Sequence, residues 1–341
     1  MSDSNRRKRF VKRNGEKGSI EELKRGILDN DRGQLAKAIT LIESNKGQHY
    51  ENGQKLLQEL LPFTGNSLRI GITGVPGAGK STFIESFGEH LCNLGYRVAV
   101  LAIDPSSTVS GGSILGDKTR MEKLARNPNA FVRPSPTAGT LGGVHRKTKE
   151  TMLLCEAAGY DIVIIETVGV GQSEVVVREM VDFFLLLVIT GAGDELQGMK
   201  KGIIELADAL VVNKADGENQ ALAKKTRREL NQILHFLQPA TKGWSTRAYT
   251  CSALENIGID KLWDTIQRFE ADTKKSGVFS ERRMQQTQEW FYSMLKDRVL
   301  NEFFQNSAIK KELPRWEESI LNEEYTSTKA VESLMKIYND Q

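Results

Sequence analysis

Gly74-Val75-Pro76-Gly77-Ala78-Gly79-Lys80-Ser81 is the stretch that decides the fold, because it matches the phosphate-binding pattern G-x-x-x-x-G-K-[ST]. An apolar run at 68–73 precedes it and an amphipathic segment at 82–94 follows it, which is the strand, loop and helix context that this pattern requires. Glycines allow positive backbone dihedrals, so consecutive N–H groups and the start of the next helix can face phosphate oxygens. A glycine-rich turn without a ligand is the alternative, and the flanking strand and helix disfavour it.

Within this loop, Lys80 is expected to place its ammonium group on the β- and γ-phosphates, and the Ser81 hydroxyl is suited to Mg²⁺. The nucleotide contacts predicted from this part of the chain are Gly74, Pro76, Gly77, Ala78, Gly79, Lys80, Ser81 and Thr82.

Short apolar runs separated by helical patterns continue outward from this loop. They lie at 68–73, 98–103, 162–165, 184–189, 209–212 and 248–251. Each is typical of a strand that is buried on both faces. Strands that alternate with helices predict an α/β fold, here a P-loop NTPase with a mostly parallel sheet flanked by helices, and they place ligands at the carboxyl ends of the strands.

A second motif, Asn213-Lys214-Ala215-Asp216, follows the run at 209–212. The Asp216 carboxylate can accept hydrogen bonds from N1–H and the exocyclic amine of guanine, whereas adenine has no donor at N1. GTP is therefore expected rather than ATP, with Asn213, Lys214 and Asp216 as base-binding residues. The alternative is an ordinary helix cap. After the last run, Ser252, Ala253 and Leu254 are similar to a further loop through which GTPases contact guanine.

Two carboxylates end strands near the predicted phosphate site. Asp104 closes the run at 98–103 and would face the Mg²⁺ held by Ser81. Glu166 begins a Glu-Thr-Val-Gly sequence where many GTPases have D-x-x-G, and Gly169 is expected to sense the γ-phosphate. We expect Lys80, Asp104, Glu166 and Gly169 to act in catalysis.

Asp117 lies in a glycine-containing loop suited to closing over the γ-phosphate, although a helix cap is its alternative role. The offset of Gln172 from Gly169 makes it a poor candidate for orienting the attacking water. A further segment, 191–201, contains three glycines and four charged residues and is expected to be mobile.

The flanks of this region read as helical. We expect a basic tail at 1–15, an N-terminal helical segment at 16–66, the GTPase domain at 67–272 and a C-terminal helical extension at 273–341. The extension carries an apolar stripe suited to packing on its own domain or on a second subunit.

Composition argues against nucleic-acid binding, a disulfide-stabilised fold and membrane insertion. The 341 residues carry 27% charged residues but a formal net charge of only +3, so no nucleic-acid partner is expected, and the basic residues at 6–13 read as a solvated tail. Three scattered cysteines fit neither a disulfide framework nor a metal cluster, and a reducing cytoplasm is expected. No run reaches the roughly 18 apolar residues of a membrane span, so no membrane association is expected.

Taken together, these motifs resemble the MeaB/ArgK family of P-loop GTPases. The resemblance runs through about 68–260 and rests on the phosphate loop, DPSS at 104–107, SGGSILGDKTRME at 110–122, RPSPTAGTLGGVHRKT at 133–148, ETVGVGQSE at 166–174, GAGDELQGMKKG at 191–202 and NKAD at 213–216.

The resemblance implies a G-protein chaperone that gates adenosylcobalamin loading and protects or rescues an adenosylcobalamin-dependent acyl-CoA mutase, chiefly methylmalonyl-CoA mutase. It also implies a homodimer organised partly by the C-terminal helices, with GTP and GDP as substrate and product. It implies Mg²⁺ ligands at Ser81, Asp104, Asp117 and Glu166. The residues implied in coupling to the partner are Asp194, Glu195, Gln197 and Lys200.

Two other functions remain open from the residues. A nickel-insertion GTPase needs Cys or His ligands, and the three Cys and four His here lack ligand spacing. A small-molecule kinase or transport-coupled ATPase would accept ATP, which the predicted guanine-binding motif disfavours.

Overall fold

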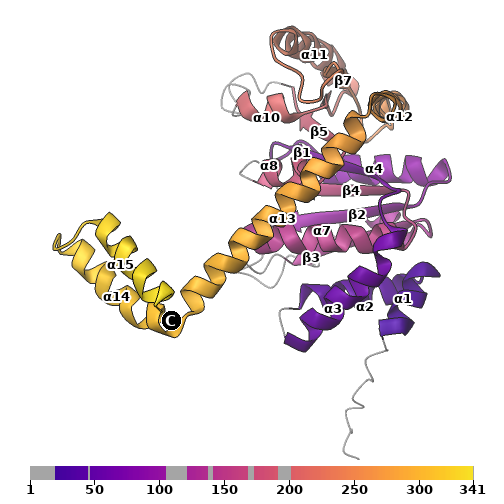
Figure 1. The fold of residues 1–341 in the computed structure, drawn as a ribbon. Coiled ribbons are helices and arrows are strands. Elements are labelled where there is room, and N and C mark those ends of the chain that lie inside the picture. The colour runs from indigo at the N-terminus through magenta and orange to yellow at the C-terminus, as the bar shows by residue number, and fades with distance from the viewer. Residues whose placement is uncertain are drawn as a thin grey trace, which may run out of the picture. The chain divides into compact units, whose positions relative to one another are not determined.

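The fold is a seven-stranded sheet with helices around it, as the computed structural model shows for residues 20–44, 47–104, 121–136, 141–167, 173–190 and 201–340 (Figure 1). The strand order is β3-β2-β4-β1-β5-β6-β7, and neighbouring strands of the sheet run parallel. The strands are β1 (Leu68–Gly74), β2 (Val98–Asp104), β3 (Ala130–Pro136), β4 (Ile162–Thr167), β5 (Phe183–Val188), β6 (Ala209–Val212) and β7 (Arg247–Thr250). The predicted P-loop fold with a parallel sheet is confirmed.

Burial explains why these segments form central strands. Every residue of β1, β4, β5 and β6 is buried, so side chains on both faces of the sheet are covered, as a parallel sheet requires. Apolar β-branched and aromatic residues fill β4 and β5, which read IVIIET and FFLLLV. The predicted strands all exist, with ends that differ by one or two residues.

One strand was missed by the sequence prediction, which gave six. The segment Ala130–Pro136 reads AFVRPSP, and its two prolines argue against a central strand because proline donates no hydrogen bond. The structure places it as β3, at the end of the sheet beside β2. An edge strand pairs on one side alone, and the prolines are tolerated there.

The helices of the strand-bearing part alternate with the strands. They are α4 (Lys80–Asn93), α6 (Glu122–Arg126), α7 (Leu141–Ala157), α8 (Ser173–Arg178), α10 (Lys201–Leu206), η2 (Gly217–Asn219), α11 (Gln220–His235) and α12 (Ile259–Ser276), followed by α13 (Val278–Gln305), α14 (Ser307–Leu321) and α15 (Ser327–Asn339). α4 contacts α6 and α12, α8 contacts α10, and α14 contacts both α13 and α15. In the described part of the chain, no helix is both long and apolar enough to cross a membrane.

A separate compact unit comprises the described residues up to Ser67 together with Glu150–Asp161. It contains α1 (Ile20–Leu28), α2 (Arg32–Glu43), α3 (Gly47–Leu60) and η1 (Leu61–Phe63). Leucine and isoleucine residues spaced for one face of each helix are buried in it, including Ile27, Leu35, Ile39 and Leu56. The predicted helical character of this segment is correct.

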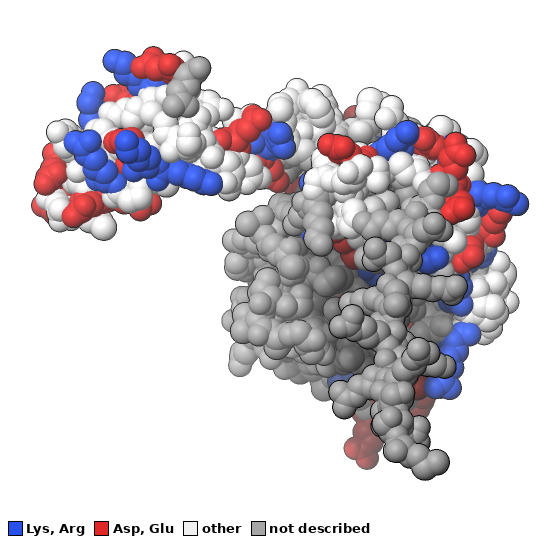
Figure 2. All heavy atoms as spheres, turned by 90° about the horizontal axis from the view of Figure 1, so that it is seen from below, with Lys and Arg blue, Asp and Glu red and all other residues white. Residues whose placement is uncertain are grey.

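Charge on the described surface is mixed. In the view of Figure 2, Lys and Arg side chains lie among Asp and Glu side chains wherever the surface is described. Such interspersion fits the formal net charge of +3.

Candidate nucleotide site

The phosphate loop connects the end of β1 to the start of α4 at the carboxyl edge of the sheet. Gly77 and Gly79 have φ of 79° and 80°, a left-handed conformation that favours glycine, and Gly79 immediately precedes the first turn of α4. Gly74 is required for a different reason, since a Cβ there would lie 2.4 Å from the carbonyl oxygen of Leu187 in β5. The loop therefore has the backbone shape that directs amide groups and a helix N-terminus toward an anion.

Lys80 is the first residue of α4, and its ammonium group lies over its own loop. Its Nζ donates to the carbonyl of Gly74 at 2.8 Å and to that of Val75 at 3.4 Å. Burial lowers the pKa of Lys80, and the carboxylates of Glu166 and Glu174 act in the opposite direction. The ammonium group is thus held at the loop by weak neutral acceptors that a phosphate can replace.

Ser81 meets the predicted metal-side carboxylate. Its Oγ donates to Oε1 of Glu166 at 3.2 Å, and Glu166, at the end of β4, is 7% exposed. On the neighbouring strands, Thr167 donates to Thr73 at 2.7 Å and fixes β4 to β1. A hydroxyl and a carboxylate at this spacing are hard oxygen donors of the kind that Mg²⁺ takes, so this described pair fits the predicted metal.

Several predicted site residues lie partly or wholly outside the described part of the chain. Asp104 is the last residue of β2, in register with Pro136 of β3, and its side chain is outside the described part. The residues that lie wholly outside it are Asp117, Gly169, Asp194, Glu195, Gln197 and Lys200.

The base-binding motif begins at the end of β6, where Asn213 joins three loops. Its Nδ2 donates to the carbonyl of Ala78 in the phosphate loop at 2.8 Å, and its Oδ1 accepts from the backbone N–H of Ala253 at 3.3 Å. Asn213 is 1% exposed, so these bonds lie in the interior. The structure therefore brings the phosphate loop, the NKAD segment and the Ser252–Ala253 segment together, although 135 and 40 residues separate the bonded partners.

Asp216 is oriented by the third of these loops. Ser252 donates to Oδ2 of Asp216 at 2.6 Å, and the same hydroxyl accepts from the N–H of Glu255 at 3.1 Å. Asp216 remains partly exposed. Ser252 thus holds one carboxylate oxygen of Asp216 in position, and Asp216 stays accessible to a ligand. A carboxylate held in this way can accept from a base that presents two hydrogen-bond donors.

Lys214 and Leu254 are the exposed members of the base-binding set. Lys214 has φ of 57°, which a non-glycine residue adopts infrequently, and its carbonyl accepts from Nδ2 of Asn219 at 2.6 Å. Leu254 is 78% exposed, which is unusual for a leucine. Both side chains are available for contact with a flat ring.

Supporting residues were missed by the sequence prediction. Asn219 bonds to Lys214 and accepts from Thr190 Oγ1 at 2.7 Å, while Ser86 on α4 donates to the carbonyl of Ala253. Glu174, in the first turn of α8, is 2% exposed and acts on the pKa of Lys80. Asn219 is a polar residue three positions after Asp216, and this closeness to the NKAD motif was a usable signal. Ser86 and Glu174 gave none because their partners are remote in sequence.

Comparison with known proteins adds an independent finding. The family model described as "Methylmalonyl Co-A mutase-associated GTPase MeaB" matches residues 35–308. GTPase ArgK of Escherichia coli is 50% identical over 288 residues, which cover 84% of this chain and 87% of that protein. The mouse protein named methylmalonic aciduria type A homolog, mitochondrial, is 42% identical over 332 residues, covering 94% of this chain and 80% of its own length.

A solved structure agrees with these sequence matches. The crystal structure of LAO/AO transport system kinase superposes with a TM-score of 0.77 at 38% identity, covering 95% of this chain and 99% of its own. The likeness extends over nearly the whole of both chains.

Proposed function

The chain belongs to the MeaB family of GTPases, and from this premise we propose that it hydrolyses GTP to control adenosylcobalamin loading onto an acyl-CoA mutase and to protect or reactivate that enzyme. Methylmalonyl-CoA mutase is the proposed partner, because the family description names it. The observation that carries the proposal is the Asn213 side chain, which bonds the phosphate loop and the Ser252–Ala253 segment at once.

Selection of guanine is proposed to come from Asp216. Its carboxylate would accept from N1–H and the exocyclic amine of guanine, with Ser252 holding one oxygen in position. The side chains of Lys214 and Leu254 would cover the guanine ring. The backbone N–H of Ala253 lies beside Leu254 in the Ser252–Leu254 loop. Adenine would bring an acceptor against the carboxylate, so discrimination should be large.

For hydrolysis, we assign binding of the triphosphate to the loop from Gly74 to Thr82 and charge neutralisation to Lys80. Ser81, Asp104, Asp117 and Glu166 would hold Mg²⁺, which when bound neutralises charge on the β- and γ-oxygens. Although burial lowers the pKa of Lys80, the Glu166 carboxylate acts to raise it and accepts from the Ser81 hydroxyl, so it lies between the charge of Lys80 and the proposed metal ligand Ser81. Gly169 is proposed to report loss of the γ-phosphate.

The output of this cycle is proposed to be a state of the mutase rather than a metabolite. The segment 191–202, with Asp194, Glu195, Gln197 and Lys200, is the proposed coupling element. Adenosylcobalamin would sit on the mutase. The three buried free cysteines support a reducing compartment, and we propose the cytoplasm.

The C-terminal helices are proposed to form a homodimer, as part of a division into a tail (1–15), a helical segment (16–66), a GTPase domain (67–272) and a dimerisation extension (273–341). Large apolar side chains on α13 support this. Each is about half exposed or more, and they are Met284, Phe291, Tyr292, Leu295, Val299, Leu300 and Phe304. Such a patch on one helix is typical of a protein interface.

The experiment compares mutase binding and activity in different nucleotide states. Purified methylmalonyl-CoA mutase is mixed with the chain and GTP, GDP or a non-hydrolysable GTP analogue, and complex formation and holoenzyme yield are measured. We expect affinity to differ between GTP and GDP by about tenfold, a coupling of about 1.4 kcal/mol. Failure of the mutase to bind in any nucleotide state would contradict the proposal.

A further inference from the structure

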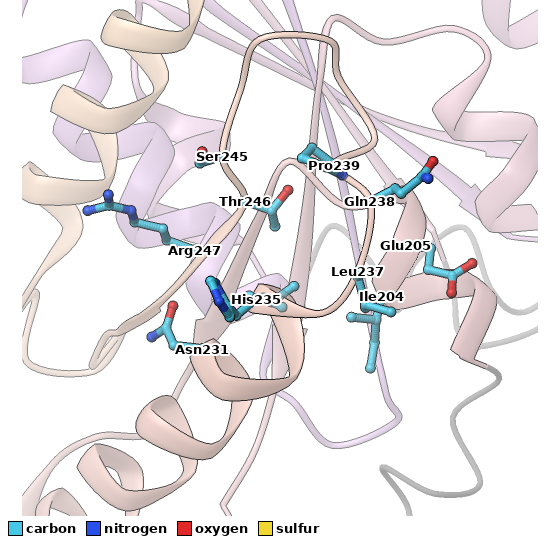
Figure 3. A pocket seen from close by; sticks show the side chains of 11 residues that line it. Ile204, Glu205, Asn231, His235, Leu237, Gln238, Pro239, Ser245, Thr246 and Arg247 are labelled. Carbon is cyan, nitrogen blue, oxygen red and sulfur yellow. The ribbon is translucent and has the colours of Figure 1, made fainter.

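A groove runs between α11, α10 and the edge strand β7, among residues that the proposed nucleotide site does not use. A cavity of about 400 Å³ is lined by α10 and α11 and by the segment that leads into β7 (Figure 3). A more open hollow of about 750 Å³ adjoins it, since Asn231, His235 and Arg247 line both. β7 lies at one end of the sheet, and the groove therefore borders its outer edge.

The chemistry of the open hollow is cationic and aromatic. Arg227, Arg228 and Arg247 line it together with the rings of Phe236 and Tyr249. Its lining, which is wholly within the described chain, includes no carboxylate, and none of the three guanidinium groups forms an ion pair with a described residue. Uncompensated arginines beside aromatic rings are suited to a ligand that carries carboxylates.

Phe236 is the most unusual of these residues because 85% of its surface is exposed. It directly follows the last residue of α11, and its ring touches that of His235, with centroids 5.6 Å apart. Exposed aromatic residues next to arginine are the types that are enriched in protein interfaces.

Aliphatic side chains line one part of the smaller cavity. In Figure 3, Arg247 and Asn231 lie on one side of His235, and Ile204 and Leu237 lie on the other. An apolar side chain of a bound peptide can enter beside Ile204 and Leu237. An acidic residue next to it in the same peptide can then face Arg247.

Asn231 restricts how a ligand can bind to β7. Its Oδ1 accepts from the N–H of Ala248 at 3.0 Å, and its Nδ2 donates to the carbonyl of Ala248 at 3.2 Å. The side-chain amide thus takes the backbone bonds that an added strand would make at that residue. Recognition at this groove is therefore through side chains rather than through extension of the sheet.

The position of α10 relates the groove to the proposed partner. α10 begins at Lys201, near the end of the segment 191–202 that is proposed to couple to the mutase, and Ile204 and Glu205 line the cavity. Three to four residues of helix span only about 5–6 Å along the axis. A partner that contacts the end of the coupling segment is within reach of the groove.

We propose that this groove is a docking site for an acidic segment of the mutase, with an apolar residue of that segment in the cavity and its carboxylates on Arg227, Arg228 and Arg247. The inference rests on the proposed function, since it names a contact with the same partner. The open shape of the hollow favours a protein segment over a small molecule. Single-stranded RNA also binds arginine and aromatic residues, but the near-neutral chain favours a protein.

The test measures the affinity of methylmalonyl-CoA mutase for the chain with a non-hydrolysable GTP analogue at low and high salt. The double variant Arg227→Glu/Arg228→Glu reverses charge in the groove, and Phe236→Ala removes the exposed ring. The matched control is Lys224→Glu/Lys225→Glu, which makes the same charge change on the same helix at exposed residues that do not line the groove. GTP turnover without the mutase and thermal melting should be unchanged in all three variants.

We expect the arginine variant to weaken mutase binding at least about tenfold at low salt, with a smaller loss at high salt, because screening weakens exposed charge pairs. Phe236→Ala should weaken it about tenfold at both salt concentrations. The lysine control should stay within about twofold of the wild type.

Three results would overturn the docking site. The first is binding of the mutase to either groove variant as tightly as to the lysine control. The second is binding of a uridine-rich RNA oligonucleotide to the wild type with a loss of affinity only in the groove variants. Failure of the wild type itself to bind the mutase would overturn the proposed function as well, and that outcome is distinct because no substitution is involved.

Discussion

The two edges of the sheet both carry charged residues, but in the described part of the chain their charged groups have different kinds of partner. At the carboxyl edge, Lys80 donates to neutral carbonyls of its own loop and Asp216 is held by a serine hydroxyl. At the amino edge, Asp182 and Asp208 are at most 1% exposed, and each contacts at least one guanidinium group.

The partners at the amino edge come from distant parts of the chain. Asp182 accepts from the N–H of Arg69 at 2.8 Å and from Arg283 at 2.7 and 2.6 Å. Asp208 accepts from the N–H of Phe184 at 2.9 Å and lies 3.2 Å from Arg178 and 3.7 Å from Arg282. Buried ion pairs fasten the start of α13 to β5 and β6, whereas Lys80 and Asp216 at the opposite edge have neutral hydrogen-bond partners that a ligand can replace. Substitutions at the two edges should therefore separate activity from stability.

The largest effect is expected for Lys80→Ala. Loss of the ammonium group should lower GTP hydrolysis by at least about a thousandfold, because a charged donor in a site that stabilises developing negative charge is removed. The melting temperature should not fall, since burial already disfavours this charge and lowers its pKa. GTP turnover and thermal melting of the same variant measure the two expected effects. Near-normal turnover would contradict the role of Lys80 in hydrolysis.

Asp208→Ala should show the opposite behaviour. It leaves the buried guanidinium groups of Arg178 and Arg282 without this partner, and we expect a loss of about 3–5 kcal/mol in the free energy of unfolding. Urea denaturation measures this loss. Asp264→Ala, at an exposed position of α12, is the matched control and should cost less than about 0.5 kcal/mol. At temperatures below the melting transition, GTP affinity should be unchanged in both variants. A large loss of GTP affinity in Asp208→Ala would show that the amino edge also affects nucleotide binding.

Asp216→Asn tests base recognition at the carboxyl edge. An amide replaces one carboxylate acceptor with a donor, so GTP affinity should fall about a hundredfold while xanthosine triphosphate gains affinity. Glu218→Gln, an exposed residue of the same loop, is the control and should not change either affinity. Titration with both nucleotides measures the effect, and unchanged GTP affinity in Asp216→Asn would show that this carboxylate does not contact the base.

The smallest effect concerns Lys149, which lies near the amino edge. Its Nζ donates to the carbonyl of Gln286 at 2.9 Å and lies 4.9 Å from the centre of the Trp290 ring. Burial, with a smaller contribution from the positive charge of Arg69, lowers the pKa of Lys149 to about 8. Between about pH 8 and the usual lysine pKa near 10.4, the unfolded chain therefore binds more protons than the folded chain does.

Stability of the wild type relative to Lys149→Met should consequently rise with pH across that window, by about 1–3 kcal/mol in total. Below pH 8 the difference should be constant. Denaturation midpoints at pH 7, 8.5 and 10 measure it, with Lys275→Met at an exposed position of α12 as the control. A relative stability that falls with pH would contradict the direction of the shift.

The two edges of the sheet also differ in how far the sequence predicts them. The residues of the phosphate loop are contiguous in the sequence, and so are those of NKAD. Their spacing specifies a ligand, so both motifs at the carboxyl edge could be recognised from the sequence alone. The strands around them could be predicted because runs such as 184–189 are uniformly apolar. β3 was not, because Pro134 and Pro136 are compatible with a strand only once its position at the end of the sheet is known.

The amino edge could not be predicted. Arg283 and Asp182 are 101 residues apart, and each is an ordinary charged residue in its local context. The same limit applies to Asn213, whose motif predicted a base contact while its bonds to Ala78 and Ala253 depend on how three loops meet. Local patterns thus identify residues that bind a ligand, but residues that bind each other require the fold.

Calorimetric titration of the wild-type chain with GTP, GDP and ATP in the presence of Mg²⁺ tests most directly whether one guanine nucleotide occupies both the phosphate loop and the base-binding loop. We predict that GTP and GDP each bind with one nucleotide per chain and that ATP binds at least about a hundredfold more weakly. Equal affinity for ATP, or no heat from either guanine nucleotide, would contradict this account of the site.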